Sequence, residues 1–276
     1  MELSVLDLFS GIGGFSLGLE ATGKFKTIGF CEKDKFCQKV LQKHWPDTPI
    51  YEDIKKLDGT KIKADVITGG FPCQSISIAG KQKGKNDDRF LFPEMLRVIK
   101  ETQARWIIGE NVQNLLNISN GEILQGIHND LETIGYEVQT FNISASSQGA
   151  WHKRSRVWIV AANTNTRLSF RENKEIQTRG ITSNNGSTNV ANSNNIRTQV
   201  QTKGKHTSFK MFGSQSKKSW WKTFSEFYRI PDGLQYGLDK DRTNRIKALG
   251  NAIVPQIATE IGKAIIKAEE EVNGWN

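Results

Sequence analysis

The stretch "LSVLDLFSGIGGFSLGLE", residues 3–20, places an apolar run directly before a glycine-rich turn and a helical pattern. Residues 3–10 have the pattern of a buried strand, and residues 14–22 are expected to form a helix. The glycines in the turn allow a tight bend and a close approach of the backbone to a ligand. A strand, a glycine turn and a helix in this order indicate the first unit of a Rossmann-like α/β fold.

The pattern continues as an alternation of short apolar runs and helical stretches. Such an alternation predicts a mixed, mostly parallel sheet with helices on both faces. An amphipathic helix should begin near Pro255, because proline fits the first turn of a helix. We expect further strands at 27–32, 49–54, 64–70, 105–111, 136–143 and 156–162, and helices at 34–44, 89–102 and 122–134.

The composition of the 276 residues is that of an ordinary globular protein, with 37% hydrophobic and 24% charged residues. No run is apolar enough for a membrane span, and the first residues lack the features of a signal peptide, so we expect a cytoplasmic location. The three cysteines, Cys31, Cys37 and Cys73, are too few and too irregularly spaced for a disulfide framework or a zinc site. We therefore expect reduced thiols and no metal.

The net charge of +9 is concentrated in one segment. Residues 163–222 hold eleven Lys and Arg but only two acidic residues, while the charges of the remainder cancel. A localised basic excess is typical of a module that binds a polyanion such as nucleic acid. The alternative is a solvated insertion, rich in Asn, Thr and Ser, whose charge serves solubility.

Two acids follow predicted strands at the edge where the glycine turn lies. Glu32 comes about twenty residues after the turn, where an acid can accept hydrogen bonds from both ribose hydroxyls. Asp53 ends the third strand and can accept from an adenine amine. The alternatives are a helix-capping acid for Glu32 and a surface acid for Asp53. The glycine spacing is not that of a dinucleotide site, and no phosphate-binding loop occurs, so the pattern favours an adenosyl ligand.

The stretch "GGFPCQSIS", residues 69–77, presents Cys73 at the switch from a strand to a loop. Most single cysteines are small buried hydrophobic residues, and we interpret Cys31 and Cys37 in that way. Cys73 stands instead among Gly, Pro, Gln and Ser. It is a candidate nucleophile, provided that its surroundings favour the thiolate.

Three further charged residues lie near neighbouring strands. Glu110 is at the end of the strand predicted at 105–111, where partial desolvation would raise its pKa and let it donate a proton. Arg154 and Arg156 stand two residues apart, so an extended chain would point both to one face, toward a phosphate or a base edge. The alternatives are a helix-capping acid and a solvated pair of arginines.

Taken in the order in which they occur along the chain, the motifs of this sequence resemble those of the cytosine-5 DNA methyltransferases of the bacterial and phage type. The similarity spans most of the chain, and the nucleophile and C-terminal motifs are highly specific. The motifs are "DLFSGIGGF", Glu32, Asp53, "GGFPCQSISIAGKQ", "GENV", "HKRSR" and "ALGNAIVPQ".

The resemblance implies S-adenosylmethionine as the cofactor and a specific sequence of double-stranded DNA as the substrate. Cys73 would attack carbon 6 of a flipped-out cytosine, Glu110 would bind its N3, and Arg154 and Arg156 would hold the base. Cofactor contacts are expected from Phe9, Ser10, Gly11, Gly13, Glu32, Asp53, Ile54 and Asn251. Substrate contacts are expected from Gln74, Ser77 and Gln82.

The resemblance also implies a division of the chain. Residues 1–162 would form the catalytic domain, residues 163–230 a small target-recognition domain, and residues 231–276 a segment that completes the catalytic domain. We expect a monomer in the cytoplasm of a bacterial or phage-infected cell, with a cognate restriction endonuclease as the partner in a restriction system. The alternatives are a tRNA cytosine-5 methyltransferase and a catalytically inactive DNA-binding homologue.

Overall fold

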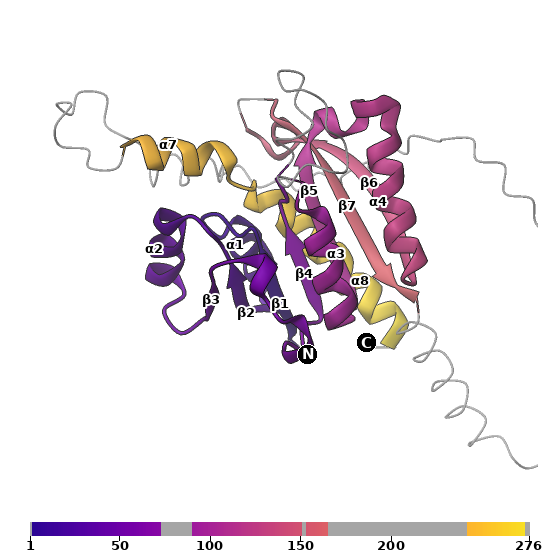
Figure 1. Cartoon of the computed structure of the whole chain (residues 1–276), viewed down its shortest axis with the longest axis horizontal. Coiled ribbons are helices and arrows are strands. Elements are labelled where there is room, and N and C mark those ends of the chain that lie inside the picture. Colours follow the sequence, from indigo (N-terminus) through magenta and orange to yellow (C-terminus); the bar gives the residue numbers. More distant parts are fainter. Residues whose placement is uncertain (1, 73–89, 151–152, 165–241, 274–276) are drawn as a thin grey trace, which may run out of the picture.

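The computed structural model describes residues 2–72, 90–150, 153–164 and 242–273. In these residues one seven-stranded sheet has the order β3-β2-β1-β4-β5-β7-β6 (Figure 1). β7 is antiparallel to both of its neighbours, and the other pairs are parallel, which confirms the predicted mixed, mostly parallel sheet. The strands are β1 (Leu3–Leu8), β2 (Phe25–Cys31), β3 (Ile50–Tyr51), β4 (Val66–Gly69), β5 (Trp106–Val112), β6 (Tyr136–Ser144) and β7 (Ser155–Asn163).

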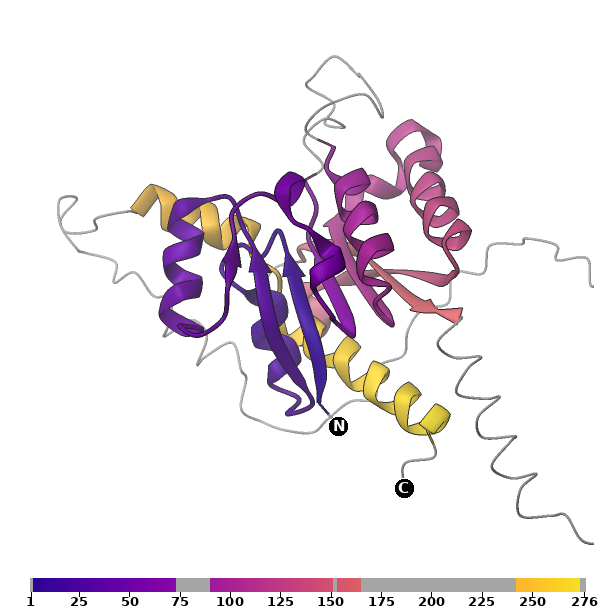
Figure 2. The same ribbon diagram turned by 60° about the horizontal axis from the view of Figure 1, so that its bottom comes forward.

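Helices cover both faces of the sheet, as the sequence predicts. The pair α1 and α8 lies on one face and the pair α3 and α4 on the other, while α2 lies at the β3 end (Figures 1 and 2). The helices are α1 (Gly14–Glu20), α2 (Lys35–His44), α3 (Phe92–Thr102), α4 (Glu122–Thr133), α7 (Arg242–Asn251) and α8 (Pro255–Asn273). Two single 3₁₀ turns follow β3, namely η1 (Ile54–Lys56) and η2 (Gly59–Lys61).

Successive side chains of a strand point to opposite faces of the sheet, and the core is therefore divided into two clusters, one on each face. On β1, Val5 packs with α1 and α8, whereas the adjacent Leu6 packs with α3 and α4. Val66 and Ile67 of β4 divide in the same way. These strands are buried on both faces, and this explains why they appear in the sequence as continuous apolar runs.

The helix boundaries follow local signals. Asp34 caps α2 by accepting hydrogen bonds from the backbone N–H groups of Phe36 and Cys37. α8 begins at Pro255, which confirms the prediction. The helix predicted from residue 89 begins at Phe92. α7 was not predicted, because its mostly polar sequence lacks a clear apolar stripe.

The order of the strands creates a crevice. β1 lies between β2 and β4 in the sheet. After β1 the chain continues to β2 on one side, whereas after β4 it continues to β5 on the other side, so a crevice forms between the carboxyl ends of β1 and β4. Ligands of open α/β sheets bind at such a point.

No helix in the described part of the chain is long and apolar enough to cross a membrane.

Candidate active site

The glycine turn after β1 is shaped by positive backbone angles. Phe9 has φ of 52°, Gly11 of 55° and Gly13 of 83°. A Cβ atom on Gly13 would lie 2.6 Å from the ring of Trp45, so packing excludes a side chain there. A Cβ atom on Gly11 would meet nothing within 4 Å. The turn is therefore tight on its Gly13 side and has open space at Gly11.

Glu32 follows β2 and faces this turn. One of its carboxylate oxygens accepts a 2.7 Å hydrogen bond from the backbone N–H of Gly11, and the other accepts one from that of Asp34. Burial raises the pKa of Glu32, and the backbone donors oppose that shift. Ser10 anchors the turn by donating to the carbonyl oxygen of Asp7 at 2.5 Å. The sheet edge thus presents an acid beside the glycine turn, as predicted.

Asp53 and Ile54 lie in the segment that follows β3. The Asp53 carboxylate caps η1 by accepting a 3.0 Å hydrogen bond from the backbone N–H of Lys55, while the Ile54 side chain is buried in the core. A hollow of about 370 Å³ opens beside them and is lined by Tyr51, Asp53, Leu57 and several lysines. Carboxylates at one end of a hollow can accept hydrogen bonds from hydroxyl and amine groups.

Glu110 lies on β5 with its carboxylate directed toward Gly70, the residue after β4. An added Cβ on Gly70 would lie 3.4 Å from a carboxylate oxygen of Glu110. The other oxygen is paired with Nε of Arg156 at 3.1 Å, and the Glu110 side chain is only 12% exposed. Burial raises the pKa of Glu110 to about 7, while the charges of Arg156 and Arg154 oppose the shift. The raised pKa agrees with the prediction from the sequence.

The two arginines make different contacts. Arg156 lies on β7 and pairs with Glu110. Arg154 precedes the strand and has φ of 24°, so its backbone is not extended. The rule that residues two apart on a strand point to one face therefore does not apply to Arg154 and Arg156. Its guanidinium donates to the carbonyl oxygens of Gly250 and Ala252 at 2.8 and 2.9 Å. Arg154 therefore fastens the turn between α7 and α8 beside the sheet.

That turn carries Asn251, the exposed last residue of α7. The chain after it packs on α1 where glycines leave room. A Cβ on Gly14 would lie 2.9 Å from atoms of Ile253, and one on Gly18 would lie 2.2 Å from the carbonyl oxygen of Pro255. These two glycines serve helix packing, and they bring the C-terminal segment to the crevice between β1 and β4.

Cys73, Gln74, Ser77 and Gln82 lie outside the described residues. The residues on either side of that segment are close together, since the rings of Phe71 and Phe90 are 6.4 Å apart. The carbonyl oxygen of Phe71 accepts a 3.1 Å hydrogen bond from the side chain of Asn111, the neighbour of Glu110. The described chain thus ends before residues 73–89 and resumes after them near Glu110. Cys31 and Cys37 are buried thiols, as predicted.

Asp7 lies under the glycine turn and was not among the residues predicted for the site. Its carboxyl group is fully buried and accepts hydrogen bonds from Thr68 at 2.7 Å and from Ser16 at 3.0 Å. Burial raises the pKa of Asp7 to about 7. The group joins β1, β4 and α1 below the site. The available signal was a charged residue within an apolar strand.

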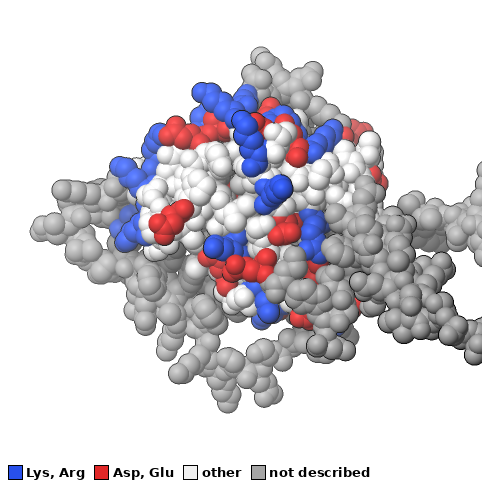
Figure 3. All heavy atoms as spheres, turned by 90° about the horizontal axis from the view of Figure 1, so that it is seen from below, with Lys and Arg blue, Asp and Glu red and all other residues white. Residues whose placement is uncertain are grey.

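Outside this site, the described residues show a further hollow. A hollow of about 260 Å³ between α8 and the strands β6 and β7 has a mainly apolar lining that includes Phe141 and Ile261, and none of the candidate site residues borders it. In the same part of the chain, no group of three or more His, Cys, Asp and Glu side chains is arranged to hold a metal ion. On the face at the amino ends of the parallel strands, basic and acidic side chains are interspersed (Figure 3).

Comparisons with known proteins agree with the resemblance seen in the sequence. The family model described as C-5 cytosine-specific DNA methylase matches residues 3–231. The type II methyltransferase M1.ScrFI of Lactococcus lactis subsp. cremoris is 41% identical over 161 residues, which cover 58% of this chain and 41% of that protein. M.AquIA of Picosynechococcus sp. is 34% identical over 191 residues, which cover 62% of this chain and 77% of that protein. The chain spans less than half the length of several curated relatives, including M1.ScrFI and M.HhaI.

Solved structures share the fold. A putative DNA modification methyltransferase encoded within an Escherichia coli prophage has a TM-score of 0.51 and 25% identity, over 60% of this chain and 48% of that one. A DNMT2 mutant of Spodoptera frugiperda has a TM-score of 0.51 and 23% identity, over 59% of this chain and 51% of that one.

Proposed function

Because the chain belongs to the C-5 cytosine-specific DNA methylase family, we propose that it transfers a methyl group from S-adenosylmethionine to carbon 5 of cytosine in a specific sequence of double-stranded DNA. The observation that carries the proposal is the buried Glu110, whose pKa of about 7 and ion pair with Arg156 suit a group that donates a proton or a hydrogen bond. The Glu110 carboxylate lies beside Gly70. Gly70 is three residues before Cys73 in the sequence.

The crevice between β1 and β4, together with the adjacent carboxyl end of β2, fits the cofactor. The Glu32 carboxylate beside the glycine turn would accept from the ribose hydroxyls, and Asp53 would accept from the adenine amine. The open space at Gly11 leaves room for the ligand against the backbone. Phe9, Ser10, Gly13, Ile54 and Asn251 complete the set of proposed cofactor contacts. When bound, S-adenosylmethionine supplies the methyl group as an electrophile.

The roles of Cys73 and Glu110 follow from the chemistry of cytosine. Carbon 5 of the free ring is too electron-poor to attack a sulfonium methyl group, so the ring must first gain electrons. The Cys73 thiolate would add to carbon 6, and Glu110 would protonate or hydrogen-bond N3 to take up the developing charge. After methylation, loss of the proton from carbon 5 and expulsion of the thiolate would restore the ring and the enzyme.

We assign the two arginines to different tasks. Arg156 pairs with Glu110 through Nε and donates to the carbonyl oxygen of Ser155 through Nη1, so its remaining N–H groups are suited to hold the base at the acid. Arg154 would instead keep the Asn251 turn at the cofactor pocket. The target base must leave the duplex stack, which costs a few kcal/mol and requires a fitted pocket. Gln74, Ser77 and Gln82 are proposed to contact the substrate around it.

The remaining proposals concern DNA recognition. Residues 163–230, almost all outside the described residues, would form the target-recognition domain between residues 1–162 and residues 231–276. Their basic excess would supply contacts to phosphates, and a smaller number of side chains would read base edges. We propose a monomeric, cytoplasmic enzyme whose protein partner, in a restriction system, is the cognate endonuclease.

The test is transfer of a labelled methyl group by the full-length chain to duplex DNA and to tRNA, followed by bisulfite sequencing of DNA from cells that express it. We expect label in DNA and methylated cytosines at one recurring sequence. Label in tRNA alone would favour the RNA alternative. Normal binding to DNA without transfer to either substrate would favour an inactive DNA-binding homologue.

A further inference from the structure

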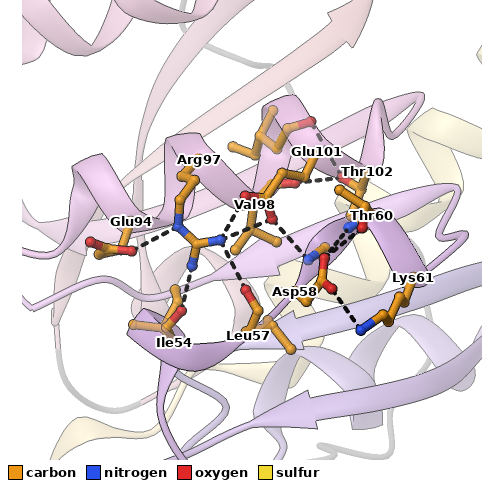
Figure 4. Close-up of polar contacts among 12 residues, drawn as sticks. Ile54, Leu57, Asp58, Thr60, Lys61, Glu94, Arg97, Val98, Glu101 and Thr102 are labelled. Atoms are coloured by element: carbon orange, nitrogen blue, oxygen red, sulfur yellow. Dashed lines mark hydrogen bonds and ion pairs between the residues drawn. The ribbon is translucent and has the colours of Figure 1, made fainter.

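A polar network joins α3 to the segment that carries Asp53 (Figure 4). The guanidinium of Arg97 donates to the carbonyl oxygen of Ile54 at 2.6 Å and to that of Leu57 at 2.9 Å. The same group is held in place by Glu94, at 2.9 Å, and by Glu101, at 2.8 Å, on its own helix. Arg97 therefore uses its planar fork to bridge two carbonyls at the start and the end of η1.

Glu101 adds a second attachment. One of its oxygens accepts a 2.8 Å hydrogen bond from the backbone N–H of Gly59, at the start of η2. The backbones of η2 and α3 are so close here that a Cβ atom on Gly59 would lie 2.9 Å from Cβ of Glu101. Thus the network reaches η1 and η2 from one face of α3.

The segment needs such support because the sheet holds it weakly. β3 consists only of Ile50 and Tyr51, and it lies at the edge of the sheet. A two-residue edge strand fixes little of the chain that follows it, because few ladder hydrogen bonds form. The side chains of Ile54 and Leu57 are buried, but apolar contacts do not fix the direction of the intervening backbone.

We propose that Arg97 is a positioning residue for the adenine end of the cofactor pocket. By holding the carbonyls of Ile54 and Leu57, it fixes η1, and with it the capping residue Asp53 that faces the hollow. Arg97 itself does not touch the ligand. This inference rests on the proposed function, since it takes Asp53 as the acceptor for the adenine amine.

The experiment compares two ligands by calorimetry on the full-length chain. S-adenosylhomocysteine carries the adenine amine, and S-inosylhomocysteine carries a carbonyl oxygen in its place. The variants are Arg97→Met, the milder Arg97→Lys and the control Lys100→Met, which removes an exposed cation from the same helix. Circular dichroism checks that each variant is folded.

We expect the wild type and Lys100→Met to bind the adenosyl ligand about tenfold more tightly than the inosyl ligand, or better, as one hydrogen bond to a charged group gives. In Arg97→Met the preference should fall below about threefold. Arg97→Lys should lose much of it, because one ammonium cannot replace a fork that bridges two carbonyls.

Equal losses of affinity for both ligands in the Arg97 variants would overturn the inference, because they would show a general structural role. An unchanged preference in Arg97→Lys, should Arg97→Met not fold, would overturn it as well. A wild type that binds both ligands equally would contradict the assignment of Asp53 and with it this inference. A wild type that binds neither ligand would contradict the proposed cofactor.

Discussion

Replacing Glu110 by Gln tests the buried acid through stability, without any knowledge of the DNA target. Burial raises the pKa of Glu110 from 4.5 to about 7 in the folded protein, against the opposing charges of Arg156 and Arg154. A carboxyl whose pKa is raised by folding contributes stability that is fully present below its unfolded pKa. That contribution is lost as the pH rises through about 7.

The magnitude follows from the two pKa values. Between about pH 5 and about pH 8, the free energy of unfolding of the wild type should fall by about 2.5 kcal/mol relative to that of Glu110→Gln. The loss of the ion pair with Arg156 shifts the difference between the two proteins but hardly affects how it changes with pH. Other titrating groups, such as Asp7, cancel because both proteins contain them.

The assay is urea unfolding of both full-length proteins at several pH values in one buffer system. A difference between the two free energies that changes by less than about 0.5 kcal/mol over this range would show that Glu110 is already ionised at neutral pH. Activity gives a second readout. Wild-type kcat/KM should fall about tenfold per pH unit above about pH 8, and Glu110→Gln should be about 10² to 10⁴ times slower near pH 7.

Three further substitutions, one of them with a control substitution, test other parts of the site. Gly18→Ala should destabilise the fold by about 1 to 3 kcal/mol in urea unfolding, because its Cβ would meet the Pro255 carbonyl, whereas Gly250→Ala, with open space around it, should change little. Arg154→Met should raise KM for S-adenosylmethionine by about tenfold or more in a methyl-transfer assay, because both charged hydrogen bonds to the turn between α7 and α8 are lost, and an unchanged KM would contradict that role. Cys73→Ser should abolish turnover and leave calorimetric binding of S-adenosylhomocysteine nearly intact; comparable turnover would remove Cys73 as the nucleophile.

Much of the fold could be predicted from the sequence because local patterns and tertiary structure agree. Apolar runs such as the one around Val5 and Leu6 are long enough to be buried on both faces, and glycine or proline marks their ends. The positions of Glu32, Asp53 and Glu110 followed from the rule that functional side chains of parallel sheets lie at the carboxyl ends of strands.

The contacts of the arginines could not be predicted in the same way. Arg154 bonds to carbonyls 96 and 98 residues away in the sequence, and its positive φ takes it out of the strand pattern. Arg97 appears in the sequence as part of the polar face of an amphipathic helix, and only the packing of α3 against η1 reveals its partners. Such long-range contacts are set by tertiary geometry, and the local periodicity of the sequence does not reveal them.

The most direct test of the central claim is the trapping of a covalent complex. A duplex that contains the methylated sequence, with 5-fluorocytosine at the target position, is incubated with the full-length chain and S-adenosylmethionine, and the adduct is mapped by mass spectrometry. Fluorine cannot leave carbon 5 as a proton does, so we predict a stable adduct on the peptide that contains Cys73, and none with Cys73→Ser. Methylation of the ordinary duplex without any adduct on the fluorinated one, or an adduct on another residue, would contradict the account.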